Sequence, residues 1–386
     1  MAPCPSVGVL ASHGALTRDS PSGGRDYPAE LVEDYWARAG QLRMTAVGAT
    51  WMVPLSATED RANRMEAETT AVVALGGNAL LRRGEPLEAA SQARAARDAA
   101  RILGVASLSH RLVVTHGNGP QVGLLALMGD AYEGTAPYPL DVLDAETEGQ
   151  IGYVLEMQLD NFIDHQDTVA VITRIVVDLD DPAFSSPTKF IGPVYREDEA
   201  HAVAHKRGWT VKPDGSDWRR VVPSPEPRRI VQLGAIRSLV EAGFLVVCAG
   251  GGGVPVLEDA DGRHQGVEAV IDKDLASSLL AGDLAADVLV LATDVEAVFC
   301  DYGTADQKAI ARGTPAGLRG HHFPSGSMGP KVEAVCRFAE CSGARAAIGS
   351  LEQLQGLLDG SAGTQVRADG PEIEYAPAMP SAASGS

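Results

Sequence analysis

Short apolar runs, most of which end just before glycine or aspartate, recur along the middle of this chain. Most of their residues are β-branched or small, and stretches with helical spacing of apolar residues, such as 88–103, lie between them. The runs are residues 70–75, 111–116, 168–173, 244–249, 286–293 and 344–348. Continuous apolar runs that alternate with helices are typical of a mostly parallel sheet buried on both faces, so the pattern predicts an α/β domain.

Glycine-rich turns follow three of these runs. They are Gly76-Gly77-Asn78, Gly117-Asn118-Gly119 and Gly250-Gly251-Gly252-Gly253. Parallel sheets bind ligands at the carboxyl ends of their strands, and glycine turns that lead into helices present backbone N–H groups to anions. Three such turns at one edge predict a shared polyanionic ligand. The chain has neither a GK[ST] Walker loop nor a GxGxxG match, which disfavours P-loop and Rossmann cofactor sites.

Lysine is scarce, because only six of the 32 basic residues are lysines. Lys273 stands between Asp272 and Asp274 at the expected start of a helix, and Lys331 follows a glycine-rich segment that leads into another helix. Lys189 lies between two prolines, which restrict the backbone around it. A compact ammonium suits phosphate neutralisation, whereas the alternative interpretation of Lys273 is an ordinary surface ion pair.

Three segments differ from the alternating pattern. Residues 185–227 combine prolines, tryptophans and short alternating runs, which predicts a small β-rich excursion, interpreted either as a lid or as an insertion without function. Residues 1–68 show no sustained period and are expected to be a poorly structured extension, and 367–386 are expected to be a disordered tail. The expected domain is therefore 69–366.

Composition excludes several classes of protein. A net charge of −19 argues against a nucleic-acid or anionic-membrane partner, and no apolar stretch reaches the roughly 18 residues of a membrane span. We see no signal peptide, and five scattered cysteines without CxxC spacing indicate free thiols in a reducing cytoplasm. We expect no metal site built from protein ligands.

The order and spacing of the motifs resemble carbamate kinase, of the amino-acid-kinase superfamily. The resemblance covers about residues 70–366, and the PTKFIGP, WRRVVPSPEP and IDKD segments are its most specific parts. The motifs are VVALGGNALL (72–81), VVTHGNGPQVG (113–123), PLDVLDAETEGQIGY (139–153), PTKFIGP (187–193), WRRVVPSPEP (218–227), CAGGGGVPV (248–256), GVEAVIDKDLAS (266–277) and SGSMGPKVEA (325–334).

The resemblance implies a three-layer αβα sandwich around a mainly parallel sheet of about eight strands, a protruding subdomain and a homodimer. It implies the reaction ATP + carbamate ⇌ ADP + carbamoyl phosphate with Mg²⁺ carried mainly by the nucleotide phosphates. The resemblance further implies that the reaction runs towards ATP, in arginine catabolism.

The resemblance also implies roles for individual residues. Lys273 and Lys331 would neutralise the transferring phosphoryl group, Asp274 would orient them with help from Asp272, and Lys189 would reach the carbamate or its phosphorylated product. The expected carbamoyl phosphate and phosphate sites comprise Gly76, Gly77, Asn78, Gly117, Asn118, Gly119, Gly251 and Gly252. The expected nucleotide side comprises Thr293, Asp294, Tyr302 and Lys331, although several family members have glycine at the position of Asp294.

Two alternatives remain open at this point. One is a sibling kinase that phosphorylates an amino-acid carboxylate such as glutamate or acetylglutamate, although such enzymes lack PTKxIGP. The other is a non-catalytic ligand-binding protein of the same fold. Retention of Lys189, Lys273 and Lys331 together argues against this second alternative.

Overall fold

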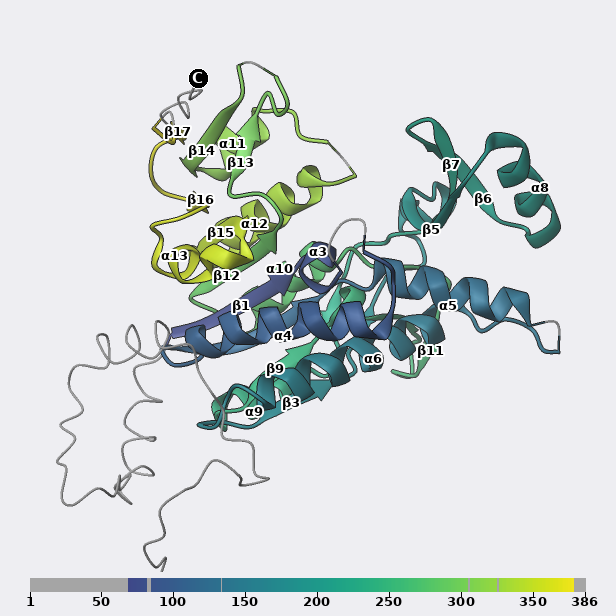
Figure 1. The fold of residues 1–386 in the computed structure, drawn as a ribbon, viewed down its shortest axis with the longest axis horizontal. Coiled ribbons are helices and arrows are strands. Elements are labelled where there is room, and N and C mark those ends of the chain that lie inside the picture. Colours follow the sequence, from purple (N-terminus) through teal and green to yellow (C-terminus); the bar gives the residue numbers. More distant parts are fainter. Residues whose placement is uncertain (1–68, 82–84, 133, 305, 325, 378–386) are drawn as a thin grey trace, which may run out of the picture. The chain divides into compact units, whose positions relative to one another are not determined.

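The computed structural model describes residues 69–377, apart from 82–84, 133, 305 and 325 (Figure 1). The expectations for 1–68 and for 378–386 lie outside the described residues.

A ten-stranded sheet forms the centre of the fold, in the order β13-β14-β16-β15-β12-β1-β2-β9-β3, with β17 also paired to β14 (Figure 1). Six adjacent strands, from β15 to β3, pair parallel with one another, and each falls on one of the six apolar runs. These strands are β15 (Arg345–Ser350), β12 (Val288–Thr293), β1 (Thr69–Leu75), β2 (His110–His116), β9 (Leu245–Cys248) and β3 (Thr168–Val171). The predicted α/β class with a mainly parallel sheet is therefore confirmed.

Four further strands enlarge the sheet beyond the expected number of about eight. They are β13 (Val298–Cys300), β14 (Lys308–Gly313), β16 (Thr364–Val366) and β17 (Ile373–Tyr375). β17 pairs antiparallel with β14, so the expectation of a disordered tail from residue 367 is wrong for this segment. The physical reason is that Ile373 packs against the main hydrophobic core, which holds the polar segment around it in place.

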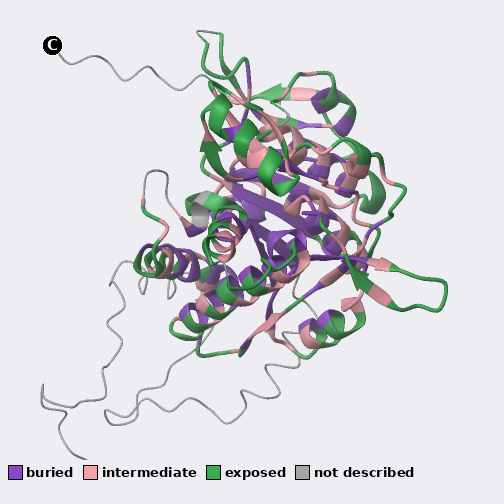
Figure 2. Ribbon diagram, turned by 90° about the vertical axis from the view of Figure 1, so that its right-hand side faces the viewer, coloured by how far each residue is buried: buried purple, intermediate pink, exposed green. Residues whose placement is uncertain are grey.

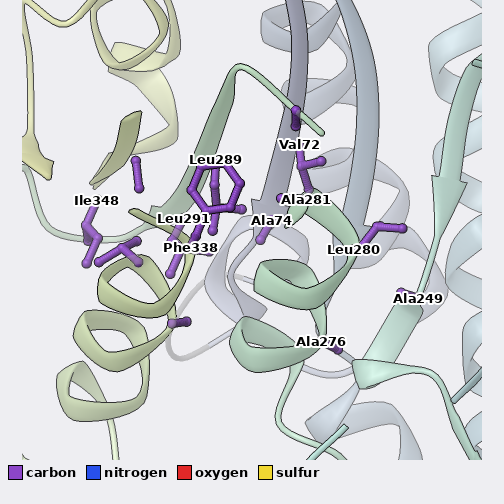
Figure 3. Close-up of a cluster of buried hydrophobic side chains, with 14 of the residues drawn as sticks. Val72, Ala74, Ala249, Ala276, Leu280, Ala281, Leu289, Leu291, Phe338 and Ile348 are labelled. Carbon is purple, nitrogen blue, oxygen red and sulfur yellow. The ribbon is translucent and has the colours of Figure 1, made fainter. Parts of the chain in front are cut away.

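Helices cover both faces of the sheet, which gives the expected three layers (Figure 2). Successive strand residues point to opposite faces, so Val72 and Ala74 belong to one core cluster and Ala71 and Val73 to the other. The first cluster, part of which Figure 3 shows, packs against α9 (Leu233–Glu241), α10 (Lys273–Asp283) and α12 (Met328–Ser342). The second packs against α4 (Ala89–Ala106), α6 (Leu140–Asp160) and α13 (Leu354–Asp359).

Two smaller sheets accompany the central one. The first is four-stranded, in the order β11 (His264–Gly266), β10 (Val254–Glu258), β4 (Arg174–Val176) and β8 (Arg229–Ile230). The second has the order β5 (Lys189–Tyr195), β7 (Asp217–Val222) and β6 (Thr210–Asp214) and carries helix α8 (Glu197–Arg207). The second sheet with α8, called the subdomain below, lies within the stretch 185–227 where we expected a β-rich excursion.

Helix α5 (Gly119–Ala131) and five short helical segments complete the described chain. The short segments are α3 (Gly77–Leu80), α7 (Pro182–Ser185), η1 (Gly250–Gly252), α11 (Pro315–Arg319) and η2 (Leu351–Gln353). Within the described ranges, no helix combines the length and apolar character needed to cross a bilayer.

Candidate active site

The start of α10 is fixed by its own sequence. Asp272 is the N-cap residue, and its Oδ1 accepts hydrogen bonds from the backbone N–H groups of Asp274 (2.9 Å) and Leu275 (3.3 Å). An aspartate at this position satisfies N–H groups that the first turn leaves unpaired. The cap therefore sets the position of Lys273 and Asp274 in the first helical turn.

Asp274 joins two of the singled-out lysines. Lys273 Nζ donates to Asp274 Oδ1 at 2.5 Å, and Lys331 Nζ donates to Asp274 Oδ2 at 2.9 Å. Asp274 is buried, and Lys331 comes from α12, which packs beside α10. The structure thus brings together residues that the sequence separates by 57 positions.

Charge and burial oppose each other in this cluster. Burial alone would raise the pKa of the Asp274 carboxyl, but Lys273 and Lys331 outweigh it and hold that pKa well below its ordinary value. Burial lowers the pKa of Lys273 and the neighbouring Lys331 adds to the decrease, while Asp274 counteracts it. The carboxylate therefore stays ionised and holds two ammonium groups at a fixed place.

Lys189 reaches the same region from the subdomain. Its Nζ donates to Asp272 Oδ2 at 2.8 Å, and its side chain remains about one third exposed, at 34%. Asp272 therefore uses one oxygen to cap α10 and the other to hold the lysine of β5. The structure brings all five predicted catalytic residues into one cluster of linked ion pairs.

The turns after β1 and β2 border this cluster. A Cβ atom on Gly117 would lie 3.4 Å from Lys273 Cδ and 3.6 Å from the backbone nitrogen of Gly77. The Gly76 N–H donates to the carbonyl of Ala292 at 3.0 Å, and a Cβ on Gly76 would approach that oxygen to 2.9 Å. Gly77 and Gly119 are exposed, which leaves their backbone groups open to a ligand.

The third turn, after β9, interlocks with the second. Gly251 has a φ of +69°, and a Cβ there would overlap the side-chain amide of Asn118. A Cβ on Gly252 would overlap the carbonyl of Ile271, next to the cap of α10. Only glycine fits the turn, because the backbone conformation and the close neighbours both exclude a side chain.

The side chain of only one of the two predicted asparagines is described. The amide of Asn118 donates to Asp144 Oδ1 (3.0 Å) and Thr147 Oγ1 (2.9 Å) on α6, so its NH₂ group is directed towards α6. Asn78 lies in α3, and its side chain is outside the described residues.

The predicted nucleotide residues follow β12 and β13. Thr293 ends β12 close to the first turn, since a Cβ on Gly76 would lie 3.7 Å from its Cα. Its hydroxyl donates to Asp294 Oδ1 at 3.2 Å, and Asp294 is exposed. Tyr302 follows β13, is 67% exposed and lies with its ring 5.9 Å from that of Phe299. Their nucleotide roles stay predictions.

Sequence reasoning missed a buried acidic pair beneath the glycine turns. Glu148 on α6 accepts hydrogen bonds from the backbone N–H groups of Gly250 (2.9 Å) and Thr173 (3.1 Å). Burial raises the pKa of Glu148 to about 8 and raises that of Asp144 well above its ordinary value. A glutamate in a helix usually faces solvent, so the sequence carried no signal for this position except its place in the motif 139–153.

His116 is buried in the same region. Its Nδ1 donates to the carbonyl of Gly117 at 3.2 Å, because a carbonyl oxygen can only accept. Burial lowers its pKa to about 4, so the ring is neutral at pH 7. A Cβ on Gly250 would overlap this ring, which leaves room only for glycine at the start of the third turn.

We expect Glu148→Gln to flatten the dependence of stability on pH. The unfolded chain releases the proton of this carboxyl near pH 4.5, whereas the folded protein holds it up to about pH 8. The stabilisation by the bound proton is therefore complete below pH 4.5 and is lost as the pH rises through 8. Urea unfolding at pH 6 and 8.5 should show wild type losing about 1–3 kcal/mol more than the variant.

A constant offset from the amide cancels in this comparison, because only the difference between the two pH values is used. Equal losses in both proteins would contradict the burial of a protonated Glu148. Glu197→Gln, at an exposed position in the first turn of α8, is the matched control and should behave as wild type.

Comparison with known proteins shows the family to which this chain belongs. The model of the amino acid kinase family matches residues 69–350, which is well over half of the chain. The chain therefore belongs to the amino acid kinase family.

Its relatives define the branch of that family. The carbamate kinase of Rhizobium meliloti is 50% identical over 307 residues, which cover 79% of this chain and 95% of that protein. The carbamate kinase of Haemophilus influenzae is 48% identical over 305 residues, covering 79% and 98%. The solved structure of Giardia lamblia carbamate kinase bound to AMP-PNP has a TM-score of 0.73 and 36% identity, covering 78% and 99%. The chain is thus a member of the carbamate kinases, and the resemblance in its motifs is confirmed.

Proposed function

We propose that this protein transfers a phosphoryl group reversibly between ATP and carbamate, giving ADP and carbamoyl phosphate. The observation that carries the proposal is the pair of ammonium groups held by Asp274 beside the turns at Gly77 and Gly117. Phosphoryl transfer needs no protein nucleophile, and its transition state is stabilised by positioned positive charge and backbone N–H groups. The two lysines supply the positive charge, and the glycine turns beside them supply the backbone N–H groups.

The arrangement assigns separate tasks to the lysines. Lys273 and Lys331 share one carboxylate, so their charge is in place before a substrate arrives. Lys189 is more exposed and comes from the subdomain, which suits contact with the carbamoyl end of the substrate. The expected direction in arginine catabolism, towards ATP, belongs to the same proposal.

A coupled assay for ATP formation from ADP and carbamoyl phosphate tests the function. We expect turnover with carbamoyl phosphate well above that with acetyl phosphate as the competing donor. Comparable use of acetyl phosphate would contradict specificity for the carbamoyl group. ATP-dependent phosphorylation of glutamate or acetylglutamate would favour the sibling kinase, and absence of all these activities would favour the non-catalytic alternative.

We propose that Mg²⁺ accompanies the nucleotide and is held mainly by its phosphates. The donor set supports this, because both oxygens of Asp274 accept from lysines and both oxygens of Asp272 are engaged as well. Within the described ranges, no group of three or more histidine, cysteine, aspartate or glutamate side chains is arranged to hold a metal ion. Magnesium bound to nucleotide phosphates would add positive charge to the transferring group.

Lys189→Ala is expected to raise KM for carbamoyl phosphate at least about tenfold while KM for ADP changes little. The reason is that Lys189 belongs to the subdomain and is joined to the rest of the cluster through Asp272. Initial rates with each substrate varied at saturation of the other measure the two constants. Equal increases in both would indicate that the subdomain does not contact the carbamoyl end.

We propose a homodimer that forms through α6 and β3. β3 is an edge strand, and Tyr153, Met157 and Ile172 are exposed apolar side chains on these two elements or just after them. Tyr153 and Ile172 border the same hollow of about 190 Å³. An exposed apolar surface beside an unpaired strand edge favours association with a second copy.

Ile172→Lys is expected to shift the protein towards monomer in sedimentation-velocity experiments, because a charge would be buried in the interface. The matched control is Leu179→Lys, which changes a similarly exposed apolar residue outside α6 and β3. A dimer unaffected by the first change would place the interface elsewhere.

The cytoplasmic location expected from the sequence stays a prediction.

A further inference from the structure

Helix α5 and strand β5 approach each other through two glycines. A Cβ atom on Gly123 would lie 2.7 Å from the Cα of Gly192 and 3.0 Å from its nitrogen, both of them backbone atoms. Real Cβ atoms do not come this close to a backbone, so any side chain on Gly123 would push the strand away. The contact joins the helix that follows the second glycine turn to the strand that carries Lys189 (Figure 1).

The backbone of β5 is specialised at this point. Gly192 has a φ of +70°, and the pairing of β5 with β7 shifts register between Ile191 and Val194. Arg219 Nε donates to the carbonyl of Gly192 at 2.8 Å, which holds the irregular peptide. The bulge is therefore fixed from the β7 side and rests on α5 from the other side.

Lys189 lies three residues before this contact. Between them, Ile191 is buried in a small apolar cluster with Val122 and Val222, so the strand has little freedom to turn. Lys189 Nζ then reaches Asp272 Oδ2 at 2.8 Å. Lys189 and Gly192 lie on one strand about 10 Å apart, so a shift of β5 at Gly192 would also move the backbone that carries Lys189.

A second contact fastens the subdomain to the same helix. Arg207, the last residue of α8, forms an ion pair with Asp130 near the end of α5, and both side chains are mostly buried. Arg207 also stacks over the ring of Trp209, at 4.9 Å from its centroid. Helix α5 is therefore a platform that contacts the subdomain at two places.

We propose that the contact between Gly123 and Gly192 sets the position of Lys189, which makes Gly123 a positioning residue for the carbamoyl substrate. This inference rests on the proposed function. Gly123 itself does not touch substrate, and it acts by letting β5 lie close enough to α5 for Lys189 to reach the site.

The test begins with Gly123→Ala. The added methyl group must displace the backbone of β5, so we expect KM for carbamoyl phosphate to rise about tenfold or more while KM for ADP stays within about twofold. Gly129→Ala is the matched control on the same helix, because a Cβ there would meet only Pro137, at an ordinary 3.7 Å. Both changes raise helix propensity equally, so that effect cancels.

A double-mutant cycle separates positioning from general damage. In a Lys189→Ala background, Gly123→Ala should add less than about twofold to KM for carbamoyl phosphate, because the positioned group is already gone. Full additivity of the two changes, or an equal rise in KM for ADP, would overturn the inference. If wild type forms no ATP from carbamoyl phosphate, the proposed function fails instead, and the unfolding midpoint of Gly123→Ala shows whether the variant is folded.

Discussion

Lys273→Ala is expected to lower kcat for ATP formation by at least about 10²-fold, because removal of one pre-positioned charge-stabilising group typically costs a few kcal/mol. Lys273 borders the second glycine turn, with its Cδ next to Gly117, and shares Asp274 with Lys331. The ammonium that remains cannot replace the one that is lost, since it approaches from a different helix. Steady-state rates with both substrates saturating measure the effect.

Two further variants sharpen this prediction. Lys206→Ala removes an exposed lysine of α8 and should leave kcat unchanged. Lys273→Arg keeps the charge but replaces a compact ammonium by a planar guanidinium beside Gly117, so we expect little recovery. Activity of Lys273→Ala within a few-fold of wild type would refute the role assigned to this residue.

Asp274→Ala is expected to lower the free energy of unfolding by about 3 kcal/mol as well as to impair catalysis. The substitution leaves the Lys273 and Lys331 ammonium groups close together without their counter-ion, and removal of one partner of a buried ion pair typically costs this much. Urea denaturation of the apo protein measures the stability loss. Asp261→Ala, which breaks an exposed pair with Arg263, should cost less than about 1 kcal/mol.

A polyanion should recover part of the lost stability. Without the carboxylate, the two ammonium groups of Asp274→Ala can pair with phosphate, so ATP or inorganic phosphate should raise the unfolding midpoint of the variant more than that of wild type. An apo stability equal to that of wild type would contradict the ion-pair geometry. Equal stabilisation of both proteins by ATP would indicate that the lysines do not face the phosphates.

The sequence predicted the sheet because the physics of its strands is local. A strand buried on both faces must be apolar throughout, and each of the six runs that satisfy this condition is a parallel strand of the central sheet. The strands that sequence reasoning did not find lie on one side of the sheet and are either three residues long or, like β14, not apolar throughout. The pairing of β17 with β14 depends on Ile373 reaching the core.

The site was only partly predictable, because some of its residues have distinctive sequence neighbours and others are defined by contacts with distant segments. Lys189, Lys273 and Lys331 stood out because lysine is rare and because glycine, proline or aspartate surrounds them. Asn118 was expected to help shape the substrate sites, but the sequence did not reveal that its side-chain amide donates to Asp144 and Thr147 on α6. Glu148 drew no attention, since nothing in a helical sequence reveals that a glutamate will lie under a glycine turn from another strand.

By itself, then, the sequence determined which segments become the parallel strands, where the glycine turns stand and which family the chain belongs to. Only the tertiary structure decided which carboxylate holds which lysine: Asp274 takes Lys273 and Lys331, and Asp272 takes Lys189. The physical reason is the sequence separation over which each kind of interaction acts. Strand and turn preferences act over a few neighbouring residues, whereas the ion pairs and the contact between Gly123 and Gly192 join segments that meet only after the helices pack on the sheet.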